Sequence, residues 1–207
     1  MISQLYKTIF VHIPKTGGQS VEMVFLDAHH LTWNSRAKLL LRPTKDKKSG
    51  PARLAHLYAS EYVDLGYISA QGFQDFYKFA VVRNPYERLM SEYRYREAWQ
   101  RMSIDRFLGV TFDSDWSDAA RHLVPQVKYV NDDKGGLLVD RIVRFERMEA
   151  DLAPVFLHVF GDDRRLPHRN SSKSGRGTVA DLTKPQLRLI TENYAVDFAA
   201  FGYPTQD

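Results

Sequence analysis

The turn that follows the predicted strand over residues 7–13 carries the residue types needed to bind an anion, and a predicted helix follows it. It offers a positive charge, two hydroxyl groups and two adjacent glycines, in the order Lys15, Thr16, Gly17, Gly18, Gln19 and Ser20. Glycine lets backbone N–H groups approach a ligand closely, and the positive end of the helix faces the same point. The segment therefore predicts a phosphate- or sulfate-binding turn, although a plain strand–turn–helix capped by Ser20 would use the same residues.

A second candidate lies after the apolar stretch 76–82, which is typical of a buried parallel strand. Arg83 comes directly after it, at the sheet edge where open α/β folds bind ligands. Pro85 can begin a helix, and Ser91 would lie about two turns into that helix. A guanidinium and a hydroxyl placed in this way can bind one phosphate together. In the structural alternative, Arg83 pairs with an acid at the helix start and Ser91 is a neutral helix residue.

Strands and helices alternate along the rest of the chain. Residues 137–145 predict a third core strand, and residues 148–160 predict a helix that Pro154 interrupts. Thr183 can cap a last helix, whereas residues 36–51 and 169–178 predict loops. The alternation predicts an α/β fold with a central, mostly parallel sheet flanked by helices. Because no linker divides the 207 residues, we expect a single domain over 1–207.

The composition is ordinary for a soluble globular protein, with 43% hydrophobic and 26% charged residues. No run of about 18 apolar residues predicts a membrane span, and the first ten residues do not resemble a secretory signal. The chain has no cysteine, which excludes disulfides and thiolate metal sites. We therefore expect no integral membrane segment, and the absence of cysteine fits a cytoplasmic location.

The net charge of +4 is unevenly distributed. Residues 36–53 hold seven basic side chains and one acidic one, Asp46. Such a patch could attract an anionic partner, and a solvated, mobile loop is the alternative. No feature of the chain predicts a nucleic-acid partner, and the oligomeric state is left open.

Together, the two candidate segments resemble the donor-binding signatures of sulfotransferases that use PAPS (3′-phosphoadenosine-5′-phosphosulfate). The closer resemblance is to the carbohydrate branch, which includes the heparan sulfate 2-O- and 6-O-sulfotransferases and small bacterial relatives. Residues 14–20 resemble its 5′-phosphosulfate loop, with Gln19 where the family usually has Thr or Ser. Residues 83–93 resemble its 3′-phosphate signature, in which the positions of Arg83 and Ser91 hold that phosphate. The similarity runs from Ile9 to about Tyr203 and implies a P-loop-like three-layer fold.

The resemblance implies that the chain transfers a sulfuryl group from PAPS to an acceptor hydroxyl, releasing PAP (3′-phosphoadenosine-5′-phosphate), with no metal required. Lys15 would neutralise the leaving phosphate. His56 belongs to a segment that resembles the family's base-bearing segment, so it would deprotonate the acceptor. Glu61 is a rival base or a group that holds His56 or the substrate, and His122 is a candidate substrate contact. In the late loop, Lys173 and Arg176 are candidate donor contacts, with a plain surface loop as the alternative.

The implied acceptor is a hydroxyl on a carbohydrate or glycoconjugate, and the implied location is the bacterial cytoplasm. The remaining histidines have structural interpretations: His12 is expected to be packed within the first strand and His158 on an amphipathic helix. We identify no histidine spacing typical of a metal site.

Two other functions use some of the same features. A P-loop nucleotide kinase would explain a phosphate turn, and residues 137–140 could pass for its Walker B strand. Its Walker A motif, however, places the lysine after the glycines, whereas Lys15 precedes them. A non-enzymatic binder of anionic polymer would use residues 36–53 and the arginine- and tyrosine-rich stretch 93–96, but it leaves Arg83 without a role.

Overall fold

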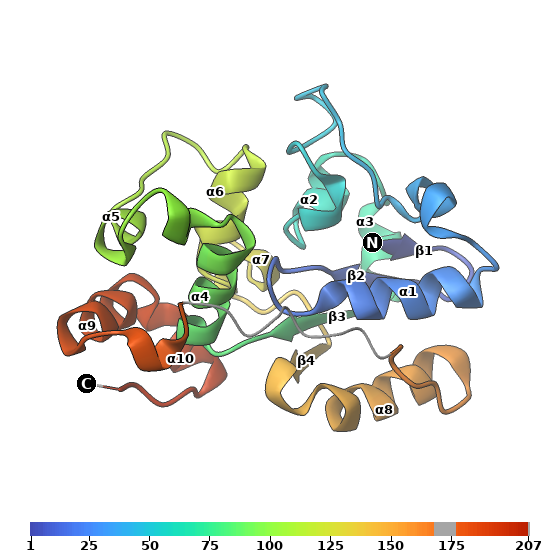
Figure 1. Ribbon diagram of the computed structural model, residues 1–207. Helices are drawn as coiled ribbons and strands as arrows, with labels where there is room; N and C mark the ends of the chain where they lie inside the picture. The colour runs from blue at the N-terminus through green and yellow to red at the C-terminus, as the bar shows by residue number, and fades with distance from the viewer. Residues whose placement is uncertain (168–176, 207) are drawn as a thin grey trace.

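The structure of the chain is a computed structural model that describes residues 1–167 and 177–206 (Figure 1). Its sheet has four strands in the order β1–β2–β3–β4. The strands are β1 (Ile2–Ser3), β2 (Thr8–Val11), β3 (Tyr77–Val82) and β4 (Arg141–Arg144). Strand β1 pairs with β2 in the antiparallel sense, whereas β2–β3 and β3–β4 are parallel. The predicted mostly parallel sheet is confirmed.

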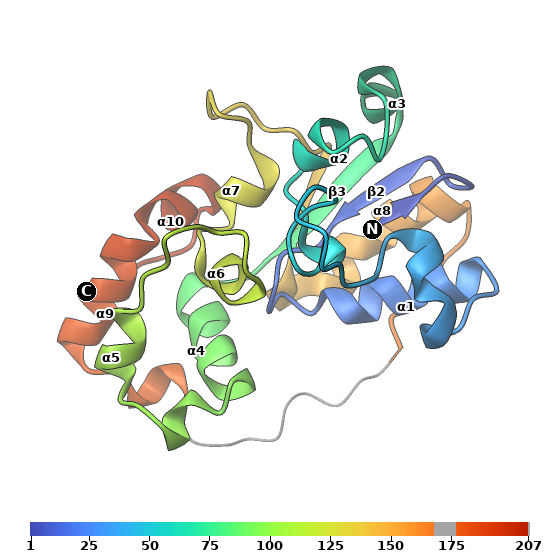
Figure 2. The same ribbon diagram turned by 90° about the horizontal axis from the view of Figure 1, so that it is seen from above.

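Helices surround this sheet and gather beyond its carboxyl edge. The α-helices are α1 (Gly18–Ala28), α2 (Glu61–Asp64), α3 (Ala70–Asp75), α4 (Pro85–Tyr95), α5 (Ile104–Leu108), α6 (Asp118–Leu123), α7 (Val127–Val130), α8 (Met148–Phe160), α9 (Lys184–Asn193) and α10 (Ala195–Phe201). Short 3₁₀ helices are η1 (Trp33–Leu39), η2 (Leu54–His56), η3 (Ala98–Gln100), η4 (Phe145–Arg147) and η5 (Val179–Asp181). Both views place α4, α5, α6, α9 and α10 together to one side of the strands (Figures 1 and 2). In the described parts of the chain, no helix is long and apolar enough to cross a membrane.

The sheet is buried on both faces. Neighbouring residues of a strand point to opposite sides, and every residue of β2 is buried. Phe10 and Phe79 face a core built with α1 and α8. Ile9 and Ala80 face a second core, to which α2, α4, α7, α9 and α10 contribute. Figure 2 shows α1 on one side of the strands and α2 and α3 on the other. The expected three-layer α/β architecture is therefore confirmed.

The parallel register positions the two candidate segments. Val11 pairs with Ala80, so β2 and β3 end at the same edge of the sheet. The turn after β2 and the arginine after β3 therefore emerge next to each other, as parallel strands require. The candidate site lies at this edge of the sheet.

Several elements differ from their sequence-based predictions. The predicted strand 137–145 shortens to β4, because Leu137 leaves the sheet and forms an isolated bridge with Asn131. The predicted loop 36–51 begins within η1. The predicted helix 148–160 is confirmed as α8, and Pro154 does not end it. Seven of the strands and α-helices were not predicted. Strand β1 is only two residues long, helices α2, α3, α5, α6 and α7 have four to six residues each, and α10 follows α9 with a single residue between them.

Candidate active site

Arg83 and Lys15 are in contact, which joins the two candidate segments. The Nη1 atom of Arg83 donates a hydrogen bond to the backbone carbonyl oxygen of Lys15, 3.3 Å away. The same guanidinium lies over the ring of Phe145, 4.3 Å from its centroid, and pairs with Glu87 at 3.3 Å. Its Nε atom is buried and has no partner among the described residues. Burial lowers the pKa of Arg83, a cost that an anionic ligand would offset.

Both glycines of the turn are required by close packing. Gly17 has a left-handed φ of 79°, and a Cβ atom there would lie 2.8 Å from the Phe145 ring. A Cβ atom on Gly18 would lie 2.3 Å from the imidazole of His12. Lys15 also adopts a left-handed φ of 70°, which is unfavourable for a residue with a side chain. The turn is therefore a constrained structure, as is common where a backbone binds a ligand.

The backbone of this turn has unused hydrogen-bond donors. Within the described chain, the N–H groups of residues 15–19 donate to no acceptor, and the first bond at the start of α1 runs from Ser20 N to Gly17 O at 3.1 Å. The Thr16 hydroxyl is already engaged, since it donates to Ile13 O at 2.9 Å. Gln19 is exposed and Ser20 is half-buried. The amides, more than the Thr16 hydroxyl, are thus available to an anion.

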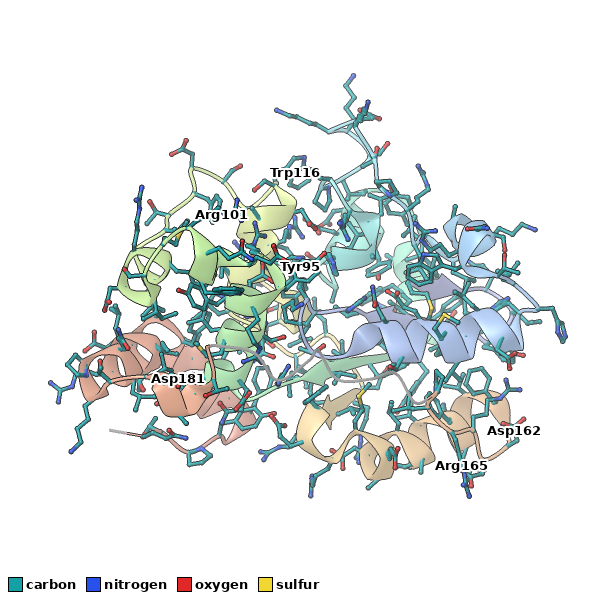
Figure 3. All side chains as sticks on the ribbon, in the orientation of Figure 1. Tyr95, Arg101, Trp116, Asp162, Arg165 and Asp181 are labelled. Atoms are coloured by element: carbon teal, nitrogen blue, oxygen red, sulfur yellow. The ribbon has the colours of Figure 1, made fainter. Side chains whose placement is uncertain are left out.

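Lys15 extends from the turn into a cavity of about 460 Å³. Its Nζ atom lies 3.7 Å from the centroid of the Tyr95 ring, a cation–π contact. Burial lowers the pKa of Lys15 to about 8, with Glu92 opposing the shift and Arg83 adding to it. Tyr95 is the last residue of α4, and Figure 3 shows it on the side of α4 that faces the start of α1. Lys15 is therefore a weakly held, electrostatically destabilised cation facing an open space.

Three histidines line one wall of this cavity. The ring of His56 stands edge-on to both others, with centroid distances of 4.8 Å to His12 and 5.2 Å to His122. The outer two are each held by a buried glutamate: His12 Nδ1 lies 2.5 Å from Glu22 Oε1, and His122 Nδ1 lies 2.7 Å from Glu92 Oε2. The expectation that His12 is packed within the strand is half right: it is buried, but it follows β2 and lines the cavity.

His56 differs from its neighbours, because its Nδ1 atom faces a backbone carbonyl instead of a carboxylate. The distance from Nδ1 to His12 O is 3.1 Å. A carbonyl oxygen can only accept, so Nδ1 carries the hydrogen and Nε2 keeps its lone pair. Burial, and then the charges of His12 and His122, lower the pKa of His56 well below its ordinary value. His56 is therefore a neutral imidazole able to take a proton.

The pKa of His122 is shifted in the opposite direction from that of His56. Burial alone lowers its pKa, but the hydrogen bond to Glu92, the close contact with Asp118 and the negative charges of both acids outweigh burial and raise it. Asp118 has a pKa of about 2, because its contacts with His122 and the charges around it outweigh its own burial. His122 Nε2 lies 3.6 Å from Asp118 Oδ1, and both atoms are buried without a hydrogen-bond partner among the described residues.

Glu61 lies behind the cavity and not on its lining. Both of its carboxylate oxygens accept hydrogen bonds from Arg121, at 2.6 and 2.7 Å. The same guanidinium donates to the backbone oxygen of His56 at 3.2 Å. The placement therefore favours the holding role that the sequence left open for Glu61 over the role of base.

Arg88 was part of the second segment, but sequence reasoning gave it no role. It is 2% exposed, and its guanidinium donates to three backbone oxygens: Pro14 O at 3.1 Å, Val124 O at 2.9 Å and His122 O at 3.0 Å. It thereby ties the start of the turn to the segment that carries His122. The sequence carried no signal of this role, because neither the burial of Arg88 nor its backbone partners can be seen without the fold.

The remaining candidate donor contacts are placed less directly. Ser91 is half-buried on α4, and no side-chain hydrogen bond links it to Arg83. Lys173 and Arg176 lie outside the described residues. Gly177, where the description resumes, accepts a hydrogen bond of 2.6 Å from Arg94 Nη1 on α4.

Sequence reasoning also missed the acidic partners of the histidines. Asp118 and His122 are four residues apart, a spacing that puts them on one helical face, and this was a readable signal. Glu22 lies on the predicted first helix, but only the folded chain brings it against His12. The same holds for Glu92 and His122.

A comparison with known families identifies the family of the chain. The model described as "Sulfotransferase family" matches residues 1–204, which include the turn, Arg83 and the three histidines. No curated protein and no solved structure matches the chain. The match covers nearly the whole sequence, and the chain belongs to the sulfotransferase family.

Proposed function

We propose that this sulfotransferase moves the sulfuryl group of PAPS to a hydroxyl of a carbohydrate or glycoconjugate, with His56 as the general base. One observation carries the proposal. The turn with its unpaired amides, the Lys15 side chain and the His56 imidazole, whose Nδ1 faces a carbonyl oxygen, all line one cavity. Sulfuryl transfer to a hydroxyl needs two components: a site that binds the anionic sulfuryl donor, and a base that takes the proton of the hydroxyl.

The donor would bind along the carboxyl edge of the sheet. The amides of residues 15–19 would hold the sulfuryl and 5′-phosphate oxygens at the start of α1, helped by the side chains of the turn. Arg83, whose Nε is unpartnered, and Ser91 would hold the 3′-phosphate. Lys173 and Arg176 would add positive charge from the late loop.

The reaction itself needs positioning and charge stabilisation. The acceptor oxygen attacks sulfur in line, the S–O bond to the 5′-phosphate breaks, and PAP leaves. The acceptor proton passes to His56 Nε2. Lys15 would leave the Tyr95 ring for the bridging oxygen, where negative charge develops in the transition state. The strained turn holds its donors in place before the reaction, so little reorganisation is needed.

The outer wall of the cavity suits a sugar that carries an acidic group. Trp33, Arg36 and Arg42 all line it, and the Arg36 guanidinium lies 4.5 Å from the Trp33 ring centroid. An aromatic face can pack against the C–H groups of a sugar, and a guanidinium can pair with a carboxylate or sulfate. His122 would contact the acceptor beside His56. Part of the basic stretch 36–53 would thus bind substrate.

The donor is tested by comparing PAP with AMP, which lacks the 3′-phosphate. PAP should raise the melting temperature of the protein more than AMP does. In Arg83→Ala this preference should shrink by about 1.5–3 kcal/mol, roughly 10- to 150-fold in affinity, because a charge-assisted contact is lost. Equal binding of PAP and AMP by the unaltered protein would overturn the assignment of the donor.

A further inference from the structure

We propose that His56, Asp118 and His122 form a binding site for one divalent transition-metal ion such as Zn²⁺, and that the bound ion inhibits the enzyme by occupying the base. The metal site stands on geometry alone. Only its inhibitory consequence rests on the proposed function.

The three side chains are close enough to share an ion. Each offers one ligand atom, and these atoms all lie within 4.8 Å of one another. Ligands of tetrahedral zinc, bound at about 2.0–2.2 Å, are roughly 3.4 Å apart. His122 Nε2 and Asp118 Oδ1, at 3.6 Å, already have this separation. A small rotation of His56 toward that pair would complete three ligands.

Two of the ligand atoms lack any other partner. Asp118 Oδ1 and His122 Nε2 are sealed from solvent and accept or donate no hydrogen bond within the described residues. His122 as a whole is only 5% exposed. Buried polar atoms are nearly always satisfied, and these two have only their 3.6 Å contact with each other, which is too long for a hydrogen bond. A cation would satisfy both at once.

The surrounding contacts are those that metal-binding histidines make. Such a histidine donates its second ring N–H to a carboxylate or a backbone carbonyl, which fixes the ring and its tautomer. His122 does so to Glu92, at 2.7 Å, and His56 does so to the carbonyl of His12, at 3.1 Å. In both rings Nε2 is therefore the nitrogen that can face the ion. Asp118 is held through its other oxygen by Arg53, at 3.3 Å.

The chemistry and the access favour a borderline metal. Two imidazoles and one carboxylate suit Zn²⁺, Co²⁺ or Ni²⁺ better than Mg²⁺ or Ca²⁺, which prefer oxygen ligands. His56 and His122 line the cavity, which gives the ion a way in and leaves its fourth position for water. Because His56 Nε2 cannot hold an ion and accept the acceptor proton together, metal binding and sulfuryl transfer would exclude each other.

The binding experiment titrates the full-length protein with Zn²⁺ against a chromophoric chelator, without nucleotide or acceptor. One equivalent should bind, and Asp118→Asn and His122→Ala should each weaken it at least tenfold. His158→Ala is the matched control: His158 lies on α8, packs against Tyr77 of β3 and does not line the cavity, so this variant should bind zinc as the unaltered protein does. Circular dichroism identifies any variant that fails to fold. Co²⁺ bound to the unaltered protein should show the visible absorption band of a tetrahedral site. If one of the two variants is unstable, this band tests the site in its place.

Zinc affinity unchanged in both Asp118→Asn and His122→Ala would overturn the site. A second experiment measures turnover of PAPS: one equivalent of zinc should abolish it, and a chelator should restore it. Full turnover with the site occupied would overturn the inhibitory role. If the protein does not turn over PAPS at all, the zinc titration still tests the metal site. A failure of the proposed function can therefore be told apart from a failure of the metal site.

Discussion

His56 donates a hydrogen bond from Nδ1 to the backbone oxygen of His12, the residue that directly follows β2. The same strand leads within a few residues to Lys15 and the candidate anion-binding turn. The candidate base is therefore anchored to the backbone that would position the donor. Arg88 strengthens this link, because it bonds to Pro14 in the turn and to His122 beside the base.

Removal of the base should affect turnover and leave donor binding intact. In His56→Ala we expect turnover to fall by roughly 10²–10⁴-fold, the usual contribution of a positioned base. PAP affinity should be nearly unchanged, because in the proposed mechanism His56 would contact the acceptor and not the donor. Steady-state kinetics and PAP titration measure the two effects, with His158→Ala as control. Near-normal turnover in His56→Ala would contradict the assignment and direct the search to His122 and then Glu61.

Donor affinity should depend on pH through Lys15, whose pKa burial lowers to about 8. A bound anion favours the charged ammonium, so its pKa is higher in the complex than in the unliganded protein. PAP affinity should therefore be full below pH 8 and decline as the pH rises above 8. Calorimetric titration across this range measures it. Lys15→Arg should lack the decline, since arginine stays charged; the same decline in that variant would assign the effect to another group.

Acceptor selection should depend on the arginines that line the cavity, and not on basic charge in general. Arg36→Ala and Arg42→Ala should raise the KM for an acidic sugar acceptor about tenfold or more, the cost of a lost charged contact. They should change the KM for its neutral analogue far less. Lys45→Ala and Lys47→Ala are matched controls, because these lysines belong to the same basic stretch but do not line the cavity. An equal effect of all four changes would indicate only long-range attraction.

Glu61 should prove to be structural. It neutralises Arg121, which is 1% exposed, so Glu61→Ala would leave a buried cation without its partner. We expect a loss of about 3–5 kcal/mol in the free energy of unfolding, measured by chemical denaturation. A Glu61→Ala protein of full stability with turnover reduced as strongly as in His56→Ala would instead identify Glu61 as the base.

The mostly parallel sheet, and the meeting of the 15–20 turn with Arg83 at one sheet edge, could be predicted from sequence because their signals are local. The stretch 76–82 is apolar throughout and becomes β3. The lysine and glycines of the turn are consecutive, and Arg83 directly follows its strand. Each of these positions follows from a short stretch of chain together with the rule that parallel strands end at one edge.

The grouping of the three histidines that line the cavity could not be predicted in the same way. His12, His56 and His122 come from three distant segments, and only tertiary packing brings their rings together. The buried acids that tune two of them are also distant or on another element, as with Glu92 and His122. Sequence patterns report which residues are apolar or helical, but not which buried polar groups will pair.

Transfer of labelled sulfate from PAPS tests the central claim most directly. The purified protein is incubated with PAPS labelled in its sulfuryl group and a panel of neutral and acidic sugars, with simple phenols as comparison acceptors. We predict that label appears on a sugar with one PAP released per sulfate transferred, and that Lys15→Ala slows this transfer more than it weakens PAP binding. Transfer to phenols with none to sugars would contradict the carbohydrate acceptor, and no transfer to any hydroxyl while PAP still binds would contradict the proposed reaction.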